Sequence, residues 1–184
     1  EDIQRLLELE APLSITTGFD RDNLYLEVCR PSVKRVELLA RVRERPGECG
    51  IVYCSTRKNV EEVCQFLQSS GISATRYHAG LEPEERQQNQ EDFLFDRVQV
   101  MVATNAFGMG IDKSDVRFVI HYNMPKDLES YYQEAGRAGR DGAEARCILL
   151  YSGQDVRTAQ FLISQSEPRE QLDPETARQL QERD

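Results

Sequence analysis

Short apolar runs recur along the chain, and longer stretches of mixed polarity separate them. The runs are rich in β-branched and other apolar residues and are only a few residues long, which is typical of buried strands. An earlier extended segment, Leu24–Val28, has a related character. The predicted strands are Gly50–Cys54, Ala74–Tyr77, Val98–Val102, Arg117–His121 and Cys147–Tyr151.

Two of the intervening stretches carry apolar residues at helical spacing. Because strands that alternate with helices are joined by right-handed crossovers, the pattern predicts an α/β fold with a mostly parallel sheet and helices on both faces. The length allows a single lobe of this kind. The predicted helical faces are Val60, Val63, Cys64 and Leu67 in one stretch, and Leu128, Tyr131, Tyr132 and Ala135 in the other.

The residues that follow these strands are polar or contain glycine, unlike the strands themselves. Parallel sheets bind their ligands at the carboxyl ends of the strands. We therefore expect a binding edge there. Its candidate segments are Ser55–Arg57, His78–Gly80, Thr104–Asn105 and Tyr122–Asn123.

The chain divides into three expected parts. Residues 1–31 form an incoming connection and the first extended segment, 32–164 form the lobe, and 165–184 begin a helical connection to a following module. Within the last part, Asp173–Glu175 is typical of an N-cap, an N1 proline and a first-turn acid. Because the sequence starts without Met and ends in helix-forming charged residues, we expect it to be a piece of a longer chain.

The composition of the 184 residues narrows the possible functions, since 23 basic and 32 acidic residues leave a net charge of -9. No apolar stretch approaches the ~20 residues that span a bilayer, so we expect no membrane partner. Nonspecific affinity for nucleic acid needs excess Lys and Arg, so any nucleic-acid site here must be local. We expect a cytoplasmic protein, associated with the nucleoid if it is bacterial.

The five cysteines form an odd set without a C-x-x-C pair, and only two histidines accompany them. This arrangement disfavours both a zinc cage and a disulfide framework. We expect reduced, buried thiols and no metal site in this chain.

The segment Tyr131–Gly142 (YYQEAGRAGRDG) is the richest in chemical information. If its first part is helical, Gln133, Arg137 and Arg140 lie on one helical face. Planar guanidinium groups bind phosphate oxygens through two parallel hydrogen bonds, so two arginines between glycines suit the charge that develops in phosphoryl transfer. The alternative is an exposed basic helix end that the helix dipole favours.

A second segment, Val100–Lys113, runs from a strand into a loop of small residues and glycines. Exposed backbone N–H groups and the Thr104 hydroxyl can hold a phosphodiester backbone. Asp112 can accept hydrogen bonds from ribose hydroxyls, or it can simply stabilise a turn. Met109 and Phe107 are packing residues by default.

Two further segments, Ser55–Asn59 and Tyr77–Leu81, carry weaker signals, since each alone is typical of a helix cap or a turn. His78 alone is more often structural than catalytic, but beside Thr104 at neighbouring strand ends it would extend a polar groove. There is no G-x-x-x-x-G-K-[ST] loop and no acidic pair for Mg²⁺. We therefore expect no nucleoside triphosphate hydrolysis by this chain alone.

In order, these four segments resemble the second motor lobe of superfamily 2 helicases, and specifically of the RecQ family of 3' to 5' DNA helicases. The resemblance covers about residues 1–165 and is strongest in Ala103–Lys113 and Tyr131–Gly142. DEAD-box helicases usually have histidine where this chain has Gln133. The resemblance implies a RecA-like lobe that works with single-stranded DNA and with a first lobe that binds ATP and Mg²⁺. Zinc would belong to a later module of the parent protein.

The resemblance also implies roles for particular residues. Arg137 and Arg140 would reach the γ-phosphate, with Arg140 as the arginine finger. Gly110, Asp112 and Gln133 would contact the nucleotide or join the interlobe network. The DNA track would consist of Ser55, Thr56, Arg57, His78, Gly80, Thr104, Asn105, Gly108 and Met109.

The chain departs from the RecQ pattern at one position, and two alternative functions stay open. Gly18–Leu24 resembles the RecQ segment F-x-R-P-N-L, but Asp22 replaces its proline, which loosens a turn without affecting the chemistry. The first alternative is a standalone nucleic-acid-binding or regulatory module without motor activity. The second is a nucleotide-dependent metabolic enzyme, which is disfavoured because no G-x-G-x-x-G follows the first strand.

Overall fold

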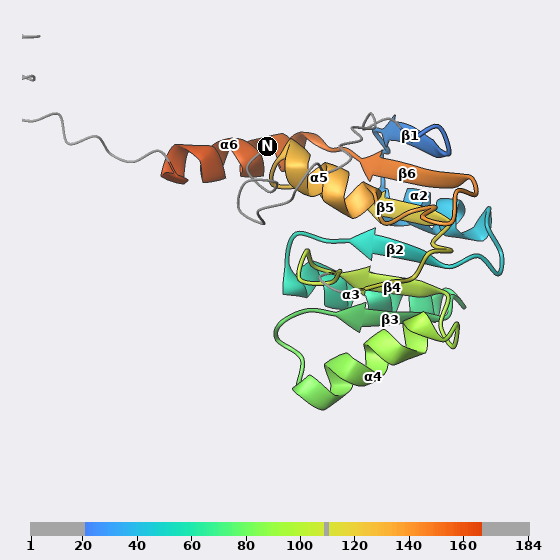
Figure 1. Cartoon of the computed structure of the whole chain (residues 1–184). Coiled ribbons are helices and arrows are strands. Elements are labelled where there is room, and N and C mark those ends of the chain that lie inside the picture. The colour runs from blue at the N-terminus through green and yellow to red at the C-terminus, as the bar shows by residue number, and fades with distance from the viewer. Residues whose placement is uncertain (1–20, 109–110, 167–184) are drawn as a thin grey trace, which may run out of the picture.

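The computed structural model describes residues 21–108 and 111–166. Six strands form one parallel sheet in the order β1-β6-β5-β2-β4-β3, so the first strand pairs with the last (Figure 1). The strands are β1 (Leu24–Cys29), β2 (Gly50–Tyr53), β3 (Ala74–Tyr77), β4 (Val100–Ala103), β5 (Phe118–His121) and β6 (Ala145–Leu150). The helices are α2 (Lys34–Arg43), α3 (Arg57–Ser69), α4 (Pro83–Leu94), α5 (Leu128–Ala135) and α6 (Gly153–Ser166).

The strand predictions are confirmed, including the parallel pairing. Ala74–Tyr77 is reproduced at both ends, and the other predicted strands are displaced by one or two residues at their ends. Strand boundaries depend on the partner strand, which the periodicity of one segment does not reveal.

Helices cover both faces of the sheet, as predicted. Successive residues of a strand point to opposite faces, so each central strand contributes side chains to two core clusters. In β2, Val52 packs with α2 and α3 in one core cluster, whereas Ile51 and Tyr53 pack in the other with Phe93 of α4. The predicted α3 face of Val60, Val63, Cys64 and Leu67 is buried in the first cluster, which confirms it.

The predicted helix is confirmed as α5, but its predicted face is only half right, because Tyr131 and Ala135 pack in the second core cluster and the other two residues do not. Ala135 is buried, but Leu128 is 79% exposed and Tyr132 is 46% exposed. Glu134 is buried instead, with 8% of its surface exposed, because its carboxylate forms a hydrogen bond with His121 of β5. A polar residue that has a hydrogen-bond partner can thus be buried at a helix position that the apolar pattern assigns to solvent.

All five cysteines carry free thiols, and four of them are buried. Among the described residues, no helix combines the length and apolar character needed to cross a bilayer. The helix start expected at Asp173–Glu175 and residues 1–20 of the expected incoming connection lie outside the described residues.

Candidate nucleotide and nucleic-acid interface

The carboxyl ends of neighbouring strands remain hydrogen-bonded beyond the strands themselves. The amide of Thr104 donates to the carbonyl of Tyr77 at 3.1 Å, and the amide of Tyr122 donates to that of Tyr53 at 2.9 Å. These bonds align the segments that follow β2, β3, β4 and β5. The sequence-predicted polar segments therefore start from one edge of the sheet.

A cleft of about 720 Å³ opens at this edge, between the carboxyl ends of β2 and β5 and the first turns of α3, α5 and α6. It contains the predicted residues Ser55, Thr56 and Asn105. Its other lining residues are Tyr53, Cys54, Asn59, His121, Asn123, Met124, Pro125, Lys126, Ser130, Glu134, Gln154, Asp155 and Thr158. The predicted residues Arg57, His78, Gly80, Thr104 and Gly108 lie outside this lining.

Asn123 ties two strand ends together inside the cleft. Its Oδ1 accepts hydrogen bonds from the amide of Ser55 at 3.1 Å and from Nδ2 of Asn59 at 3.0 Å. The backbone of Ser55, the first predicted track residue, is thereby fixed by a side chain that the sequence placed at the binding edge but did not assign to the DNA track. An asparagine after a strand is the usual mark of a turn, so the sequence offered no stronger signal.

Arg57 and Gly80 bring the two weaker segments together. A Cβ atom built on Gly80 would lie 3.0 Å from Nη1 of Arg57, so the absent side chain leaves room for the guanidinium. At the start of α3, the Thr56 hydroxyl accepts from the amide of Asn59 at 3.1 Å and caps the helix. Arg57 therefore projects from a capped helix start and is exposed to solvent.

Both ring nitrogens of His78 are occupied. Nδ1 accepts from the amide of Gly80 at 3.1 Å, and Nε2 lies 2.7 Å from Oε1 of Glu61. His78 is only 5% exposed. It thus stabilises the turn that presents Gly80 and offers no free ring nitrogen in this arrangement.

The helix of the arginine segment ends earlier than predicted, at Ala135. Turns follow, in which the amide of Arg137 bonds the carbonyl of Glu134 at 3.3 Å, and Gly139 adopts a φ of +56°. Gln133, Arg137 and Arg140 are therefore not one continuous helical face. Within these turns, Gly139 takes the left-handed conformation that other residues avoid.

Arg137 packs against the second predicted segment. Its Nη1 donates to the carbonyl of Gly108 at 2.5 Å, while its Nε is buried without a partner among the described residues. The hydroxyl of Tyr53 donates to the carbonyl of Phe107 at 3.2 Å nearby. Burial raises the pKa of Tyr53, although the positive charge of Arg137 opposes this rise. Arg137 thus lies beside the carboxyl end of β2.

Arg140 lies farther from the binding edge. Its Nη1 donates to the carbonyl of Ile111 at 2.9 Å and lies 3.9 Å from Oδ1 of Asp112, whose side chain is 98% exposed. The amide of neighbouring Gly139 bonds the carbonyl of Val116 at 2.9 Å, near the start of β5. Because α5 runs away from the carboxyl ends of the strands, the arginines that follow it contact the loop after β4. They do not line up with the polar segments at the strand ends.

Gln133 is exposed, and its Nε2 donates to Glu129 at 3.1 Å within α5. Met109 and Gly110 lie outside the described residues. The contribution predicted for these three residues stays a prediction.

Arg21 and Asn23 hold the loop that carries Arg140. Arg21 Nη2 donates to the carbonyl of Gly139 at 2.6 Å, and Asn23 Nδ2 donates to Gly139 at 2.8 Å and to Ala143 at 2.9 Å. The expectation that Asp22 in place of proline leaves the chemistry unaffected stays a prediction. The two neighbours of Asp22 cross-link the start of β1 to the arginine segment, and the RecQ-like spacing of these residues was the available signal.

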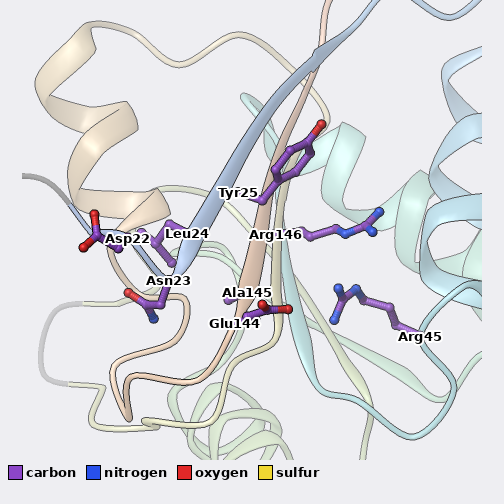
Figure 2. Close-up of a pocket in the computed structure, with 8 residues that line it drawn as sticks. All are labelled: Asp22, Asn23, Leu24, Tyr25, Arg45, Glu144, Ala145 and Arg146. Carbon is purple, nitrogen blue, oxygen red and sulfur yellow. The ribbon is translucent and has the colours of Figure 1, made fainter.

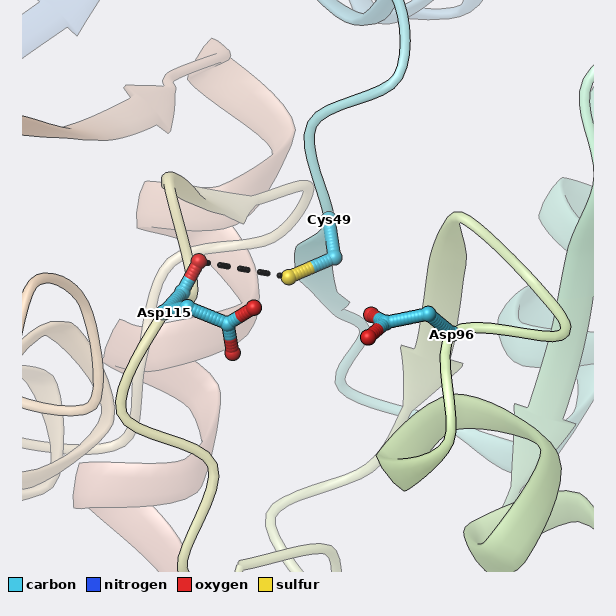
Figure 3. A group of neighbouring side chains, drawn as sticks. All are labelled: Cys49, Asp96 and Asp115. Carbon is cyan, nitrogen blue, oxygen red and sulfur yellow. Dashed lines mark hydrogen bonds between the residues drawn. The ribbon is translucent and has the colours of Figure 1, made fainter.

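An acidic group of Cys49, Asp96 and Asp115 lies at the opposite end of the sheet, before β2 and β5 (Figure 3). Nζ of Lys113 already lies 2.7 Å from Asp96 and 3.1 Å from Asp115. Burial raises the pKa of the Cys49 thiol to about 11, so it stays protonated and donates to the carbonyl of Asp115. The Lys113 ammonium therefore already pairs with both carboxylates of this group, and a protonated thiol is a poor metal ligand.

A smaller pocket of about 300 Å³ lies at the start of β1 and β6 (Figure 2). Its cations have local partners, since the guanidinium of Arg146 lies 5.7 Å from the ring centre of Tyr25 and Nη1 of Arg45 lies 2.6 Å from Glu48. These contacts leave little unbalanced charge for a ligand.

Comparison with known proteins agrees with this geometry. The family model for the helicase conserved C-terminal domain matches residues 33–142. The ATP-dependent DNA helicase RecQ of Bacillus subtilis is 48% identical over 170 residues, which are 92% of this chain and 29% of the relative. The ATP-dependent helicase SGS1 of Saccharomyces cerevisiae is 46% identical over 164 residues, which are 88% of this chain and 11% of that protein.

A solved structure of Saccharomyces cerevisiae Dbp5, bound to Gle1 and IP6, has a similar fold with a TM-score of 0.64. It is 23% identical, and the match covers 79% of this chain and 41% of Dbp5. This likeness confirms the RecA-like fold. The matched family model contains the strand-end segments, the glycine loop and the arginine segment. The chain therefore belongs to the helicase conserved C-terminal domain family, as a C-terminal lobe of the RecQ type.

Proposed function

We propose that this chain is the second motor lobe of an ATP-dependent 3' to 5' DNA helicase. It acts with a first lobe on the same polypeptide, which binds ATP and Mg²⁺. The family match and the two helicase relatives support this proposal. Because the chain spans 29% of the RecQ relative, the remaining length leaves room for that lobe.

The observation that carries the proposal is the state of the two arginines. Both donate to backbone carbonyls of the glycine loop, and neither has a carboxylate of the described residues within normal hydrogen-bond distance. Nε of Arg137 is buried without a partner among the described residues. A phosphate oxygen supplies the acceptors and negative charge that this pair lacks, so these residues fit a nucleotide.

Arg140 is the residue we assign as the arginine finger, because its side chain is 36% exposed and can reach toward a facing lobe. Asp112, also exposed, would contact the ribose or couple the lobes. Gly110 and Gln133 would complete this side of the site. ATP, when bound, supplies the γ-phosphoryl group whose hydrolysis drives the motor.

The DNA track would follow the carboxyl edge of the sheet. Ser55, Thr56 and Asn105 contribute polar groups in the cleft, and Arg57 contributes the positive charge for a phosphate. Thr104 and the Gly108–Met109 backbone would extend the track along the loop. His78 would act by holding Gly80 in place.

We expect no steady ATP turnover from the 184-residue chain alone, since the nucleotide-binding residues would lie on the first lobe. Closure of the two lobes would bring the arginines to the nucleotide, and reopening would advance the strand. Single-strand affinity of the isolated chain should be weak and sensitive to salt.

The arginine assignment can be tested in a two-lobe protein, meaning a polypeptide that carries this chain behind its first helicase lobe. Arg140→Ala should lower DNA-stimulated ATP turnover by about 10³-fold or more. Arg146→Ala is the matched control, because Arg146 is 39% exposed and lies 3.8 Å from a glutamate oxygen, much as Arg140 lies near Asp112. Normal turnover in the Arg140 variant would refute the assignment.

The DNA track has a separate test. Arg57→Ala should weaken single-strand binding and reduce the salt dependence of that binding by about one phosphate contact. Arg43→Ala is the control, since Arg43 lies at the end of α2 and donates to the carbonyl of Ser70. A two-lobe protein that binds DNA but never hydrolyses ATP would favour the alternative of a non-motor binding module.

A further inference from the structure

His121 and Glu134 form a buried polar pair between β5 and α5. Nε2 of His121 lies 2.9 Å from Oε2 of Glu134. The two residues are 0% and 8% exposed. The imidazole is also packed between Tyr53, 5.6 Å away between ring centres, and Tyr131, 4.9 Å away.

The pair is polar on both sides, although an apolar pair would fill the same space. A carboxylate oxygen only accepts hydrogen bonds, so Nε2 of His121 carries the proton that it donates to Glu134. Nδ1 of His121 is buried and has no partner among the described residues. Desolvating these groups costs free energy, and apolar replacements of buried charged pairs are often at least as stable. Stability alone does not account for this pair.

The pair is directly connected to Arg137. The amide of Arg137 donates to the backbone carbonyl of Glu134 at 3.3 Å, which closes one turn between the two residues. Glu134 is therefore held at two points, since its carboxylate contacts His121 and its carbonyl contacts Arg137. His121 is fixed in the sheet, because β5 pairs with β2 at Tyr53 and with β6 at Leu149. The end of α5 is therefore attached to the rigid sheet through one directional hydrogen bond.

A second contact at the same helix end is weaker. The thiol of Cys147 lies 3.5 Å from the carbonyl of Ala135. An apolar contact would leave α5 free to slide or rotate slightly, whereas the hydrogen bond defines one rotation of the helix about its axis. This rotation sets where the turn after α5 begins, and that turn carries Arg137 toward Gly108.

We propose that Glu134 and His121 are positioning residues, which fix the end of α5 so that Arg137 is held in its reactive orientation. The inference rests on the proposed function, since it assigns a task to the arginine segment of the motor. Neither residue has to touch the nucleotide or the DNA.

The test is the double variant His121→Leu with Glu134→Met in the two-lobe protein, which removes both polar groups together. We expect its urea midpoint to equal or exceed that of the parent, because no buried charge is left unpaired. We expect kcat for DNA-stimulated ATP hydrolysis to fall about tenfold or more, because small misplacements of a catalytic group are costly. KM for ATP should change by less than about twofold. A stable double variant with normal kcat would overturn the proposal.

Two further variants keep the result interpretable if the double variant is unstable. Glu134→Gln preserves an acceptor for Nε2 of His121, so its kcat should stay within about threefold of the parent, whereas Glu134→Ala should lose activity. A loss in the Gln variant equal to that in the Ala variant would overturn the positioning role. Val63→Ala, in the core on the other face of the sheet, is the control for lost stability without lost kcat.

Combination with Arg137→Ala separates this inference from the proposed function. If the pair acts through Arg137, adding the double variant to Arg137→Ala should cause little further loss of kcat. Full additivity would contradict the positioning role while leaving the motor assignment intact. Normal kcat in Arg137→Ala and in Arg140→Ala would instead refute the motor assignment itself.

Discussion

The guanidinium of Arg137 occupies the space that a side chain at Gly108 would need. A Cβ atom on Gly108 would lie 2.1 Å from Cζ of Arg137, and the backbone of Gly108 has a φ of +130°. The glycine loop and the arginine segment, which are 29 residues apart, therefore depend on each other for their conformation. This relationship gives the first prediction.

Gly108→Ala should displace Arg137 and lower ATP turnover of the two-lobe protein about as much as Arg137→Ala does. The unfolding free energy should fall by about 2 kcal/mol or more, because both the backbone strain and the clash are unfavourable. Urea unfolding and steady-state turnover measure the two effects. Gly47→Ala is the control, since Gly47 has a φ of +78° but nothing within 4 Å of the added Cβ. Equal losses for both variants would show that strain alone acts.

Asn23 should be a sensitive position in the loop that carries Arg140. Asn23→Ala removes the donor to the carbonyls of Gly139 and Ala143, which should cost about 1 to 2 kcal/mol of stability. Asn23→Asp should be worse, because one carboxylate oxygen would face the two carbonyl oxygens, although the other oxygen keeps the hydrogen bond from Nε of Arg21. Thermal or urea denaturation gives the ranking. An Asp variant as stable as the Ala variant would argue against these two hydrogen bonds.

Asp155 should make the free energy of unfolding of the lobe depend on pH in the acidic range. Burial opposes its ionisation, but hydrogen bonds from Lys34 and Ser152 outweigh burial and hold the pKa of Asp155 below its usual value of 3.8. A lowered folded-state pKa adds stability that is complete above the unfolded pKa and is lost as the pH falls through the folded pKa.

Asp155→Asn should therefore lower the unfolding free energy by about 3 kcal/mol near pH 7, since Lys34 loses its charged partner 2.7 Å away. The difference from the parent should shrink steadily as the pH falls below about 5. Urea unfolding at several pH values measures it, with the exposed Glu84→Gln as control. A difference that is constant with pH would rule out ionisation of Asp155 as the cause.

The thiols should react slowly in the native protein. Burial raises the pKa of Cys49 and Cys64 to about 11 and that of Cys147 to about 12. At pH 8 the thiolate fraction of such groups is about 10⁻³ or less, and the thiolate is the reactive species. Labelling with a thiol reagent should be slow in buffer and complete in urea. Rapid native labelling of any of these three residues would contradict their burial.

The sequence predicted the sheet well because the strands are buried on both faces and read as continuous apolar runs. Val100, Met101 and Val102, for example, are all 0% exposed. It predicted α3 equally well, since that helix covers the sheet with one apolar face. For α5 it predicted the helix and the burial of Ala135, but not the burial of Glu134, whose partner lies 13 residues earlier in the chain. A one-dimensional pattern carries no information about such a partner.

The sequence predicted which segments form the candidate site but not how these segments are arranged in space. Strand-end chemistry brought Ser55, Thr56 and Asn105 into one cleft, as expected from the parallel sheet. The position of Arg140 depends on the turns that follow α5, where Gly139 has a left-handed conformation. The supporting residues Arg21 and Asn23 could not be assigned from composition, because their partners are backbone carbonyls more than 100 residues away.

The pairing of β1 with β6 has a consequence for synthesis of the protein. Leu24 is paired with Ala145 and Cys29 with Leu150, so the first strand of the described sheet is completed only by the last. As the nascent chain leaves the ribosome, β2, β3 and β4 can associate early, while the backbone donors and acceptors of the β1 segment wait for more than 100 residues before β6 can pair with them. This high contact order makes the closing edge the slow step of folding and the place where a nascent chain most needs a chaperone.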